Sequence, residues 1–223
     1  MFGDSNIKWN FITIGKDCSP AAALKNMELR KAALPFDWVA STVNALDKCF
    51  AENFERFHTN LYKNNGKTRM IDSYGFEFPH DYPTIQQDTS GDLITESYIA
   101  DDWESHYDVI KAKYDRRIDR FRNILSDPAP VIVLCRYYMV ELMIIQKIFI
   151  KYYNKHNIYF VNATHESFEN ATILCINPEK MGDWNNTEIW NQGISQIIQK
   201  IKHNSHCFTP FYILNADRKG RRI

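Results

Sequence analysis

Apolar residues are distributed along this chain in two patterns, which predict two kinds of element. Short, continuously apolar runs are typical of strands with both faces buried. Longer segments with apolar residues three or four positions apart are typical of helices with one buried face. The predicted strands are 11–15, 130–136, 158–164, 171–177 and 210–216. The predicted helices are 21–34, 41–62, 104–125, 138–153 and 188–203.

The order of these elements predicts the class of fold. Apolar strands that alternate with helices favour a parallel sheet covered on both faces. We therefore predict a three-layer α/β domain with Rossmann-like or flavodoxin-like winding, in which strands 11–15 and 131–135 are central. The whole chain, 1–223, is predicted to be a single domain with a long loop-rich insertion at about 70–103. A loop of that length in a compact domain is usually functional or disordered, and its aromatic residues favour function.

Composition and charge exclude several function classes. Lys plus Arg and Asp plus Glu both number 27, so the chain has no net charge to attract nucleic acid or an anionic membrane. No apolar window is long enough for a membrane span, and no signal peptide precedes the first strand. Five cysteines without a CxxC motif indicate reduced thiols and a cytoplasmic location. Metal-ligand and glycine-rich phosphate motifs are absent, so no cofactor is predicted.

Cys18 is the most informative of the five cysteines. It lies between the strand FITIG and a helix that begins near Pro20, with Asp17 or Ser19 as its N-cap. The free N–H groups and the dipole at a helix N-terminus lower the pKa of a cysteine, which favours a reactive thiol. The alternative is a cysteine that only packs the turn. A nucleophile on a strand–turn–helix elbow resembles the placement in SGNH-type and α/β hydrolases, although the G-x-S-x-G motif is absent.

Several segments of the chain resemble one known family. IGKDCSPAAALKNMELRKAALPFDW at 14–38, FPHDY at 78–82, YDRRIDRF at 114–121 and the strand ending in Arg136 are similar to the DUF1796 family of papain-like cysteine peptidases. The resemblance implies a Cys18 nucleophile and a His80 base. Papain-like folds are α+β, so the family name and the predicted parallel sheet point to different architectures.

The remaining catalytic roles have more than one candidate. His80 lies among aromatic residues beside Asp81, which suits a general base, and His165, just after a predicted strand, is its rival. His58 is predicted to lie on the surface of a helix. Asp81 and Asp37 are the candidates for a third catalytic residue, and a helix or turn cap is the alternative role for Asp37.

Polar residues at the carboxyl ends of the predicted strands are candidates for substrate binding, because ligands of open α/β sheets bind there. Arg136 is either a clamp for an anionic substrate group or the partner of Glu141 in an ion pair. Asn162 is either an oxyanion donor or a turn former. Ser19 and Trp38, which belong to the stretch around Cys18, complete this set.

These residues together favour a cysteine-dependent hydrolase or acyl transferase. Backbone N–H groups near residues 18–20 would hold the oxyanion, and the substrate would be a peptide, an ester or another small acyl compound. The first alternative is a non-catalytic binding domain on the same fold. The second is a carbohydrate- or nucleotide-processing enzyme with a pocket at Arg136 and Asn162.

Overall fold

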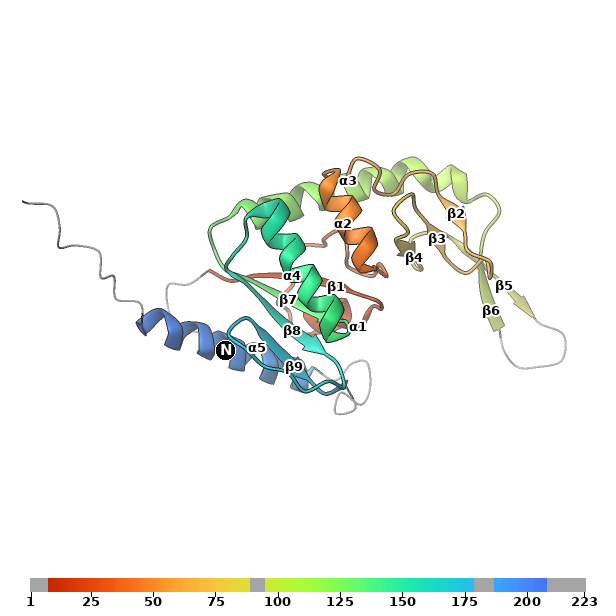
Figure 1. Ribbon diagram of the computed structural model, residues 1–223. Helices are drawn as coiled ribbons and strands as arrows, with labels where there is room; N and C mark the ends of the chain where they lie inside the picture. The colour runs from red at the N-terminus through yellow and green to blue at the C-terminus, as the bar shows by residue number, and fades with distance from the viewer. Residues whose placement is uncertain (1–7, 89–94, 179–186, 208–223) are drawn as a thin grey trace, which may run out of the picture.

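A four-stranded parallel sheet forms the centre of the protein in its computed structural model, which describes residues 8–88, 95–178 and 187–207 (Figure 1). Its strands, in spatial order, are β1 (Asn10–Gly15), β7 (Val131–Arg136), β8 (Ile158–Ala163) and β9 (Ile173–Ile176). All three neighbouring pairs are parallel. In this register Ile12 lies opposite Val133, and Val133 lies opposite Phe160.

Helices cover both faces of this sheet. They are α1 (Ser19–Asn26), α2 (Val43–Ala51), α3 (Tyr107–Ser126), α4 (Met139–Tyr153) and α5 (Glu188–Cys207). Val133 of β7 belongs to the apolar core shared with α2, α3 and α4, whereas its neighbours Ile132 and Leu134 belong to the core shared with α1 and α5. Successive residues of a strand point to opposite faces, so the two cores lie on opposite sides of the sheet. The predicted α/β class is therefore confirmed.

The predicted central position of residues 11–15 is wrong. In the sheet formed by the described strands, β1 lies at an edge, and β7 and β8 are the central strands. A continuously apolar strand indicates that both faces are buried, and it carries no information about its two edges. Rossmann-like and flavodoxin-like windings place the first strand inside the sheet, so the described strand order does not show either of them. The predicted strand 210–216 lies outside the described residues.

Two predicted helices are shorter than their patterns suggested. The helix predicted at 21–34 ends at Asn26, and the one predicted at 41–62 ends at Ala51. After Ala51 the chain passes through left-handed backbone conformations at Asn53, Phe54 and His58, which a helix does not allow. Phe54 is nevertheless buried, because this irregular segment packs on the same core as α2. His58, predicted to be exposed, has no exposed surface.

The predicted loop-rich segment 70–103 carries short strands. A small antiparallel sheet contains β2 (Tyr62–Lys63), β3 (Met70–Ile71) and β4 (Glu77–Phe78). A hairpin of β5 (Thr84–Asp88) and β6 (Thr95–Ile99) extends from it, and a 3₁₀ turn, η1 (Trp103–His106), leads into α3 (Figure 1). This arrangement places residues 79–83 between the small sheet and the hairpin.

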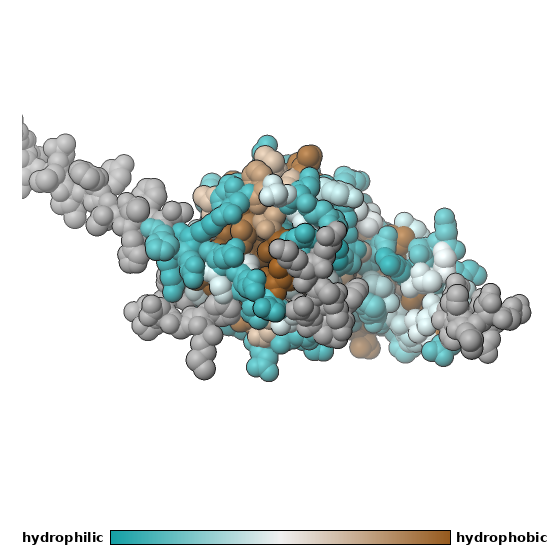
Figure 2. All heavy atoms as spheres, turned by 90° about the horizontal axis from the view of Figure 1, so that it is seen from below, coloured by the Kyte–Doolittle hydropathy of each residue, from teal (hydrophilic) through white to brown (hydrophobic). Residues whose placement is uncertain are grey.

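The surface mixes apolar and hydrophilic side chains. Figure 2 shows one face, on which an apolar area is bordered by hydrophilic residues. Large exposed apolar side chains are concentrated on and just before α4, namely Tyr138, Val140, Met143 and Ile144. Among the described helices, none is long and apolar enough to cross a membrane.

The burial of His58 predicts a loss of stability in acid. Burial lowers the pKa of His58 to about 4, whereas an unfolded histidine has a pKa of about 6.5. The unfolded state therefore takes up a proton as the pH falls below 6.5, and the folded state does so only near 4. The stabilisation is present above pH 6.5 and is lost between 6.5 and 4, with a total of about 3 kcal/mol.

This prediction is tested by urea unfolding at pH 7 and pH 4 in the native protein and in His58→Asn. Asparagine does not titrate and tolerates the left-handed backbone of this position. Burial raises the pKa of Asp72 to about 6, which has the opposite effect in acid, but Asp72 is present in both proteins. The native protein is expected to lose about 3 kcal/mol more than the variant. Equal losses would contradict the assignment to His58.

Candidate active site

Cys18 lies at the elbow where β1 ends and α1 begins. It occupies the N-cap position of α1, and its side chain does not cap the helix. Asp17 takes over that role, because its Oδ1 accepts hydrogen bonds from the backbone N–H and the hydroxyl of Ser19, at 2.9 and 2.7 Å. Pro20 follows in the first turn, where its missing N–H costs nothing. The predicted elbow is thus present, with Cys18 rather than Asp17 or Ser19 at the cap position.

Two sets of backbone hydrogen bonds bring the segment around His80 to this elbow. The Ser41 N–H donates to the carbonyl of Gly15, at the end of β1, over 2.8 Å. Ala40 and Glu77 exchange backbone hydrogen bonds of 3.0 and 3.1 Å, which attaches β4 to the same segment. His80 follows two residues after β4. Its Nε2 lies 3.3 Å from Sγ of Cys18, which is within hydrogen-bonding distance.

Trp38 packs against the histidine of this pair. The two ring centroids are 6.2 Å apart and the rings are nearly perpendicular, an edge-to-face contact. Trp38 has a backbone φ of +67°, a left-handed conformation that is rare for a bulky residue. Strained backbone of this kind is concentrated at functional sites, where the surrounding structure holds it in place.

The environment of Cys18 differs from the one that its sequence position predicts. Only 8% of the residue is exposed, and this burial raises the pKa of the Cys18 thiol, with the negative charge of Asp17 adding to the effect. The predicted lowering by the helix N-terminus is therefore wrong. Two of the N–H groups on which it depended are not available, since Ser19 donates to Asp17 and Pro20 has none. The positive charge of Arg69 acts in the opposite direction and lowers the pKa of Cys18.

Neither candidate for a third catalytic residue contacts the ring of His80. Asp37 is completely buried; its Oδ1 accepts from the Thr13 hydroxyl at 2.6 Å and its Oδ2 from the Leu34 N–H at 3.0 Å. Asp81 instead binds Lys113 and Tyr114, both on α3. Within the described residues, the ring of His80 forms its only hydrogen bond with Cys18. Among the described residues, Cys18 and His80 therefore form a pair in which no third side chain is bonded to the imidazole.

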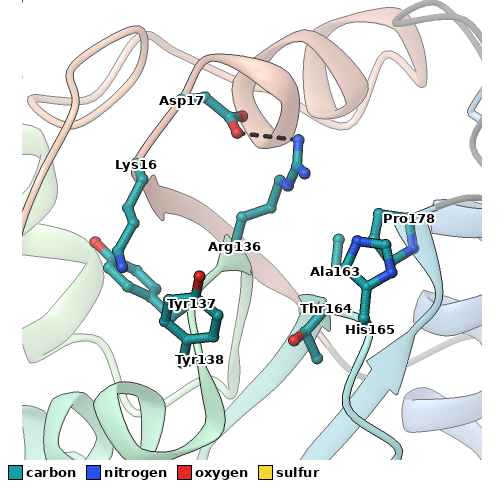
Figure 3. Close-up of a pocket in the computed structure, with 9 residues that line it drawn as sticks. All are labelled: Lys16, Asp17, Arg136, Tyr137, Tyr138, Ala163, Thr164, His165 and Pro178. Atoms are coloured by element: carbon teal, nitrogen blue, oxygen red, sulfur yellow. Dashed lines mark ion pairs between the residues drawn. The ribbon is translucent and has the colours of Figure 1, made fainter.

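Arg136 does not have the partner that its position in the sequence suggested. Its guanidinium pairs with Asp17 over 3.0 Å and lies 3.4 Å from the Ser19 hydroxyl, so it braces the elbow from the side of β7 (Figure 3). Glu141, the expected partner, pairs instead with Lys16 over 2.8 Å.

A cavity of about 290 Å³ opens beside Arg136 at the carboxyl ends of the parallel strands (Figure 3). It is lined by residues that follow the strands, among them Lys16, Tyr138 and His165. Cys18 and His80 are not in its lining. His165, the rival base, lines this cavity, whose lining does not include Cys18.

Asn162 is fully buried and its amide is occupied by the backbone of Tyr137. Its Oδ1 accepts from the Tyr137 N–H, and its Nδ2 donates to the Tyr137 carbonyl, both at 2.9 Å. These two bonds connect β8 to the chain just after β7. A substrate has no access to this amide, so the candidate role as an oxyanion donor does not fit its environment. Ser19 is also buried, with its hydroxyl turned to Asp17.

The donors around Cys18 limit what could stabilise an oxyanion. Of the predicted N–H groups at 18–20, the one of Cys18 itself is without a hydrogen-bond partner in the described structure. Side chains suited to a metal ion do not occur in groups of three or more anywhere in the described ranges. The arrangement is therefore suited to proton transfer between sulfur and imidazole, with one backbone donor beside the sulfur.

Arg69 is a further residue near the site, and no sequence pattern predicts it. It lies just before β3 and pairs with Glu77 over 2.6 Å, close enough to Cys18 to affect its pKa. No local pattern marks it, since it reaches the site through the pairing of β3 with β4.

Comparison with known proteins adds one match. The family model described as "Putative papain-like cysteine peptidase (DUF1796)" matches residues 9–155, which include the elbow, the segment around His80 and β7. No curated protein and no solved structure matches the chain.

Proposed function

We propose that this chain, which belongs to the DUF1796 family, is a cysteine-dependent hydrolase or acyl transferase. Within the matched region it carries a cysteine in contact with a histidine. The observation that supports this most directly is the 3.3 Å distance between Sγ of Cys18 and Nε2 of His80. The two residues are separated by 62 positions in the sequence, and the two sets of backbone hydrogen bonds described above connect their segments. A nucleophile and a base within hydrogen-bonding distance are the minimum for covalent acyl transfer.

In the proposed reaction, Sγ of Cys18 attacks the carbonyl carbon of the substrate while Nε2 of His80 accepts the thiol proton. The tetrahedral intermediate places its oxyanion near the backbone N–H of Cys18. When it collapses, the bond to the leaving group breaks, and that group takes the proton from His80. The product is a thioester on Cys18, which water or an amine then attacks with His80 again as the base.

The raised pKa of Cys18 suits this order of events. A buried thiol beside Asp17 stays protonated at neutral pH, so the free enzyme holds a thiol rather than a preformed thiolate. His80 then removes the proton as the sulfur attacks, which is general-base catalysis of the nucleophile.

A non-catalytic binding domain is the second candidate function. It is favoured by the small exposed fraction of Cys18, 8%, since an inert cysteine that fills a turn would be buried in the same way. A carbohydrate- or nucleotide-processing pocket has less support, because Asn162, one of its two defining residues, is fully buried.

The thioester intermediate provides the test. The protein is incubated with activated peptide esters and thioesters, quenched in acid and digested, and the peptide that contains Cys18 is weighed by mass spectrometry. We expect an acyl adduct on Cys18 that hydroxylamine removes, and none in Cys18→Ala. The matched control is Cys49→Ala, because Cys49 is fully buried and has a raised pKa but no histidine partner among the described side chains. No adduct from any substrate class would favour the binding domain.

A further inference from the structure

We propose that Asp81 is a positioning residue, which holds His80 at Cys18 by binding Tyr114 and Lys113 of α3. This inference rests on the proposed function. This role differs from that of a third catalytic residue. Asp81 fixes the backbone next to His80 and does not form a bond to the imidazole.

In the described structure, the side-chain contacts of Asp81 are with two residues of α3. Its Oδ2 accepts a hydrogen bond from the Tyr114 hydroxyl and its Oδ1 pairs with Nζ of Lys113, each over 2.5 Å. The carboxylate is only 9% exposed, and Tyr114 is fully buried in the core beneath it. Hydrogen bonds to a charged group in such surroundings are stronger than those between neutral groups. Asp81 is therefore fixed to the middle of a long helix.

The next residue is fixed as well. The hydroxyl of Tyr82 lies 2.9 Å from Nε2 of His58, and the two rings are stacked with a centroid distance of 5.8 Å. Both residues are buried. Tyr82 therefore provides a second attachment for the segment that follows His80 in the chain.

His80 itself has few contacts that could orient it. It is an exposed residue, its ring has no carboxylate partner among the described residues, and Trp38 touches it only at the edge. The position of its backbone therefore decides how far Nε2 lies from Sγ of Cys18. A displacement of about 1 Å in reacting groups can reduce a rate about a hundredfold, so fixing this backbone has a large effect.

A direct electrostatic role for Asp81 predicts the opposite result. The negative charge of Asp81 contributes to the raised pKa of Cys18, so its removal would by itself increase the thiolate fraction and accelerate alkylation. A positioning role predicts slower alkylation. The sign of the change therefore separates the two.

The test measures the rate of Cys18 alkylation by iodoacetamide against pH, with peptide mapping, in the full chain. Asp81→Ala is expected to slow the reaction at pH 7 about tenfold, and Tyr114→Phe, which removes one hydroxyl and no charge, about threefold. Asp81→Asn keeps an acceptor for Tyr114 and should stay within about twofold of the native rate. In a His80→Ala background, neither Asp81→Ala nor Tyr114→Phe should slow the reaction further.

Tyr153→Phe is the matched control, since its hydroxyl is buried in the same core without a hydrogen-bond partner in the described structure. It should leave the alkylation profile unchanged. If His80→Ala slows alkylation but Asp81→Ala and Tyr114→Phe do not, the positioning role is wrong and the proposed function stands. If Asp81→Ala and Tyr114→Phe slow alkylation equally in the His80→Ala background, Asp81 does not act through His80. If His80→Ala itself has no effect, both proposals fail.

Discussion

Replacement of His80 by alanine is expected to slow the alkylation of Cys18 at pH 7 by about 30-fold or more. A thiol with an ordinary pKa of about 8.5 is only about 3% thiolate at pH 7, and burial raises the pKa of Cys18, which lowers that fraction further. In the native protein, His80 accepts the proton over 3.3 Å as the sulfur reacts. Without it, the sulfur depends on the small thiolate fraction alone.

The shape of the pH profile is as informative as the rate. The native protein should already react near neutral pH, where His80 accepts the thiol proton, and its rate should rise further as the thiol ionises. His80→Ala should keep only the rise, above the pKa of an ordinary thiol. His165→Ala is the control, because His165 lines the cavity of Figure 3 and Cys18 does not. Coincident profiles for the native protein and His80→Ala would exclude His80 as the base.

Replacement of Phe36 by alanine is expected to lower the free energy of unfolding by about 3–5 kcal/mol. Phe36 is 2% exposed, and its ring lies within 6 Å, centroid to centroid, of five other phenylalanine rings. Those rings are Phe50, Phe54, Phe57, Phe76 and Phe121. The change would leave a cavity where α2, the small sheet and α3 meet. A domain of this kind has a total stability of about 5–15 kcal/mol, so the loss is a large fraction of it.

Urea unfolding of the native protein and Phe36→Ala measures this difference. Phe168→Ala is the matched control, since Phe168 is an exposed phenylalanine and its removal should change stability by less than about 0.5 kcal/mol. A loss below about 1 kcal/mol for Phe36→Ala would show that the cluster of rings closes around the missing one. Because Phe36 is two residues from Trp38, Cys18 alkylation in this variant would also report how firmly the cluster supports the site.

The elements that depend on local pattern were predicted well from the sequence. β7, β8 and β9 and the helices α3, α4 and α5 begin and end near the predicted residues, because their apolar periodicity is regular. The helix predicted at 41–62 is too long, because its apolar spacing continues beyond the end of the helix. Phe54 and Phe57 keep a helical spacing, yet they are buried from an irregular segment that the core holds in place.

The dyad was expected from Cys18 at the elbow and from the family resemblance of FPHDY, and these two side chains do meet. The partners of the other site residues were not predicted. Arg136 pairs with Asp17 instead of Glu141, Asp81 turns to α3, and Asn162 is fixed to Tyr137. Each of these contacts joins elements that are far apart in the chain.

The sequence by itself determined which segments become strands and helices, and that Cys18 lies on a strand–helix elbow, because hydrophobic period and capping residues act over a few positions. Only the tertiary structure decided the order of the strands, the edge position of β1 and the distance between Cys18 and His80. It also decided the direction of the pKa shift of Cys18. The position at a helix N-terminus is only one contribution to that pKa, and burial depends on everything that packs around the thiol.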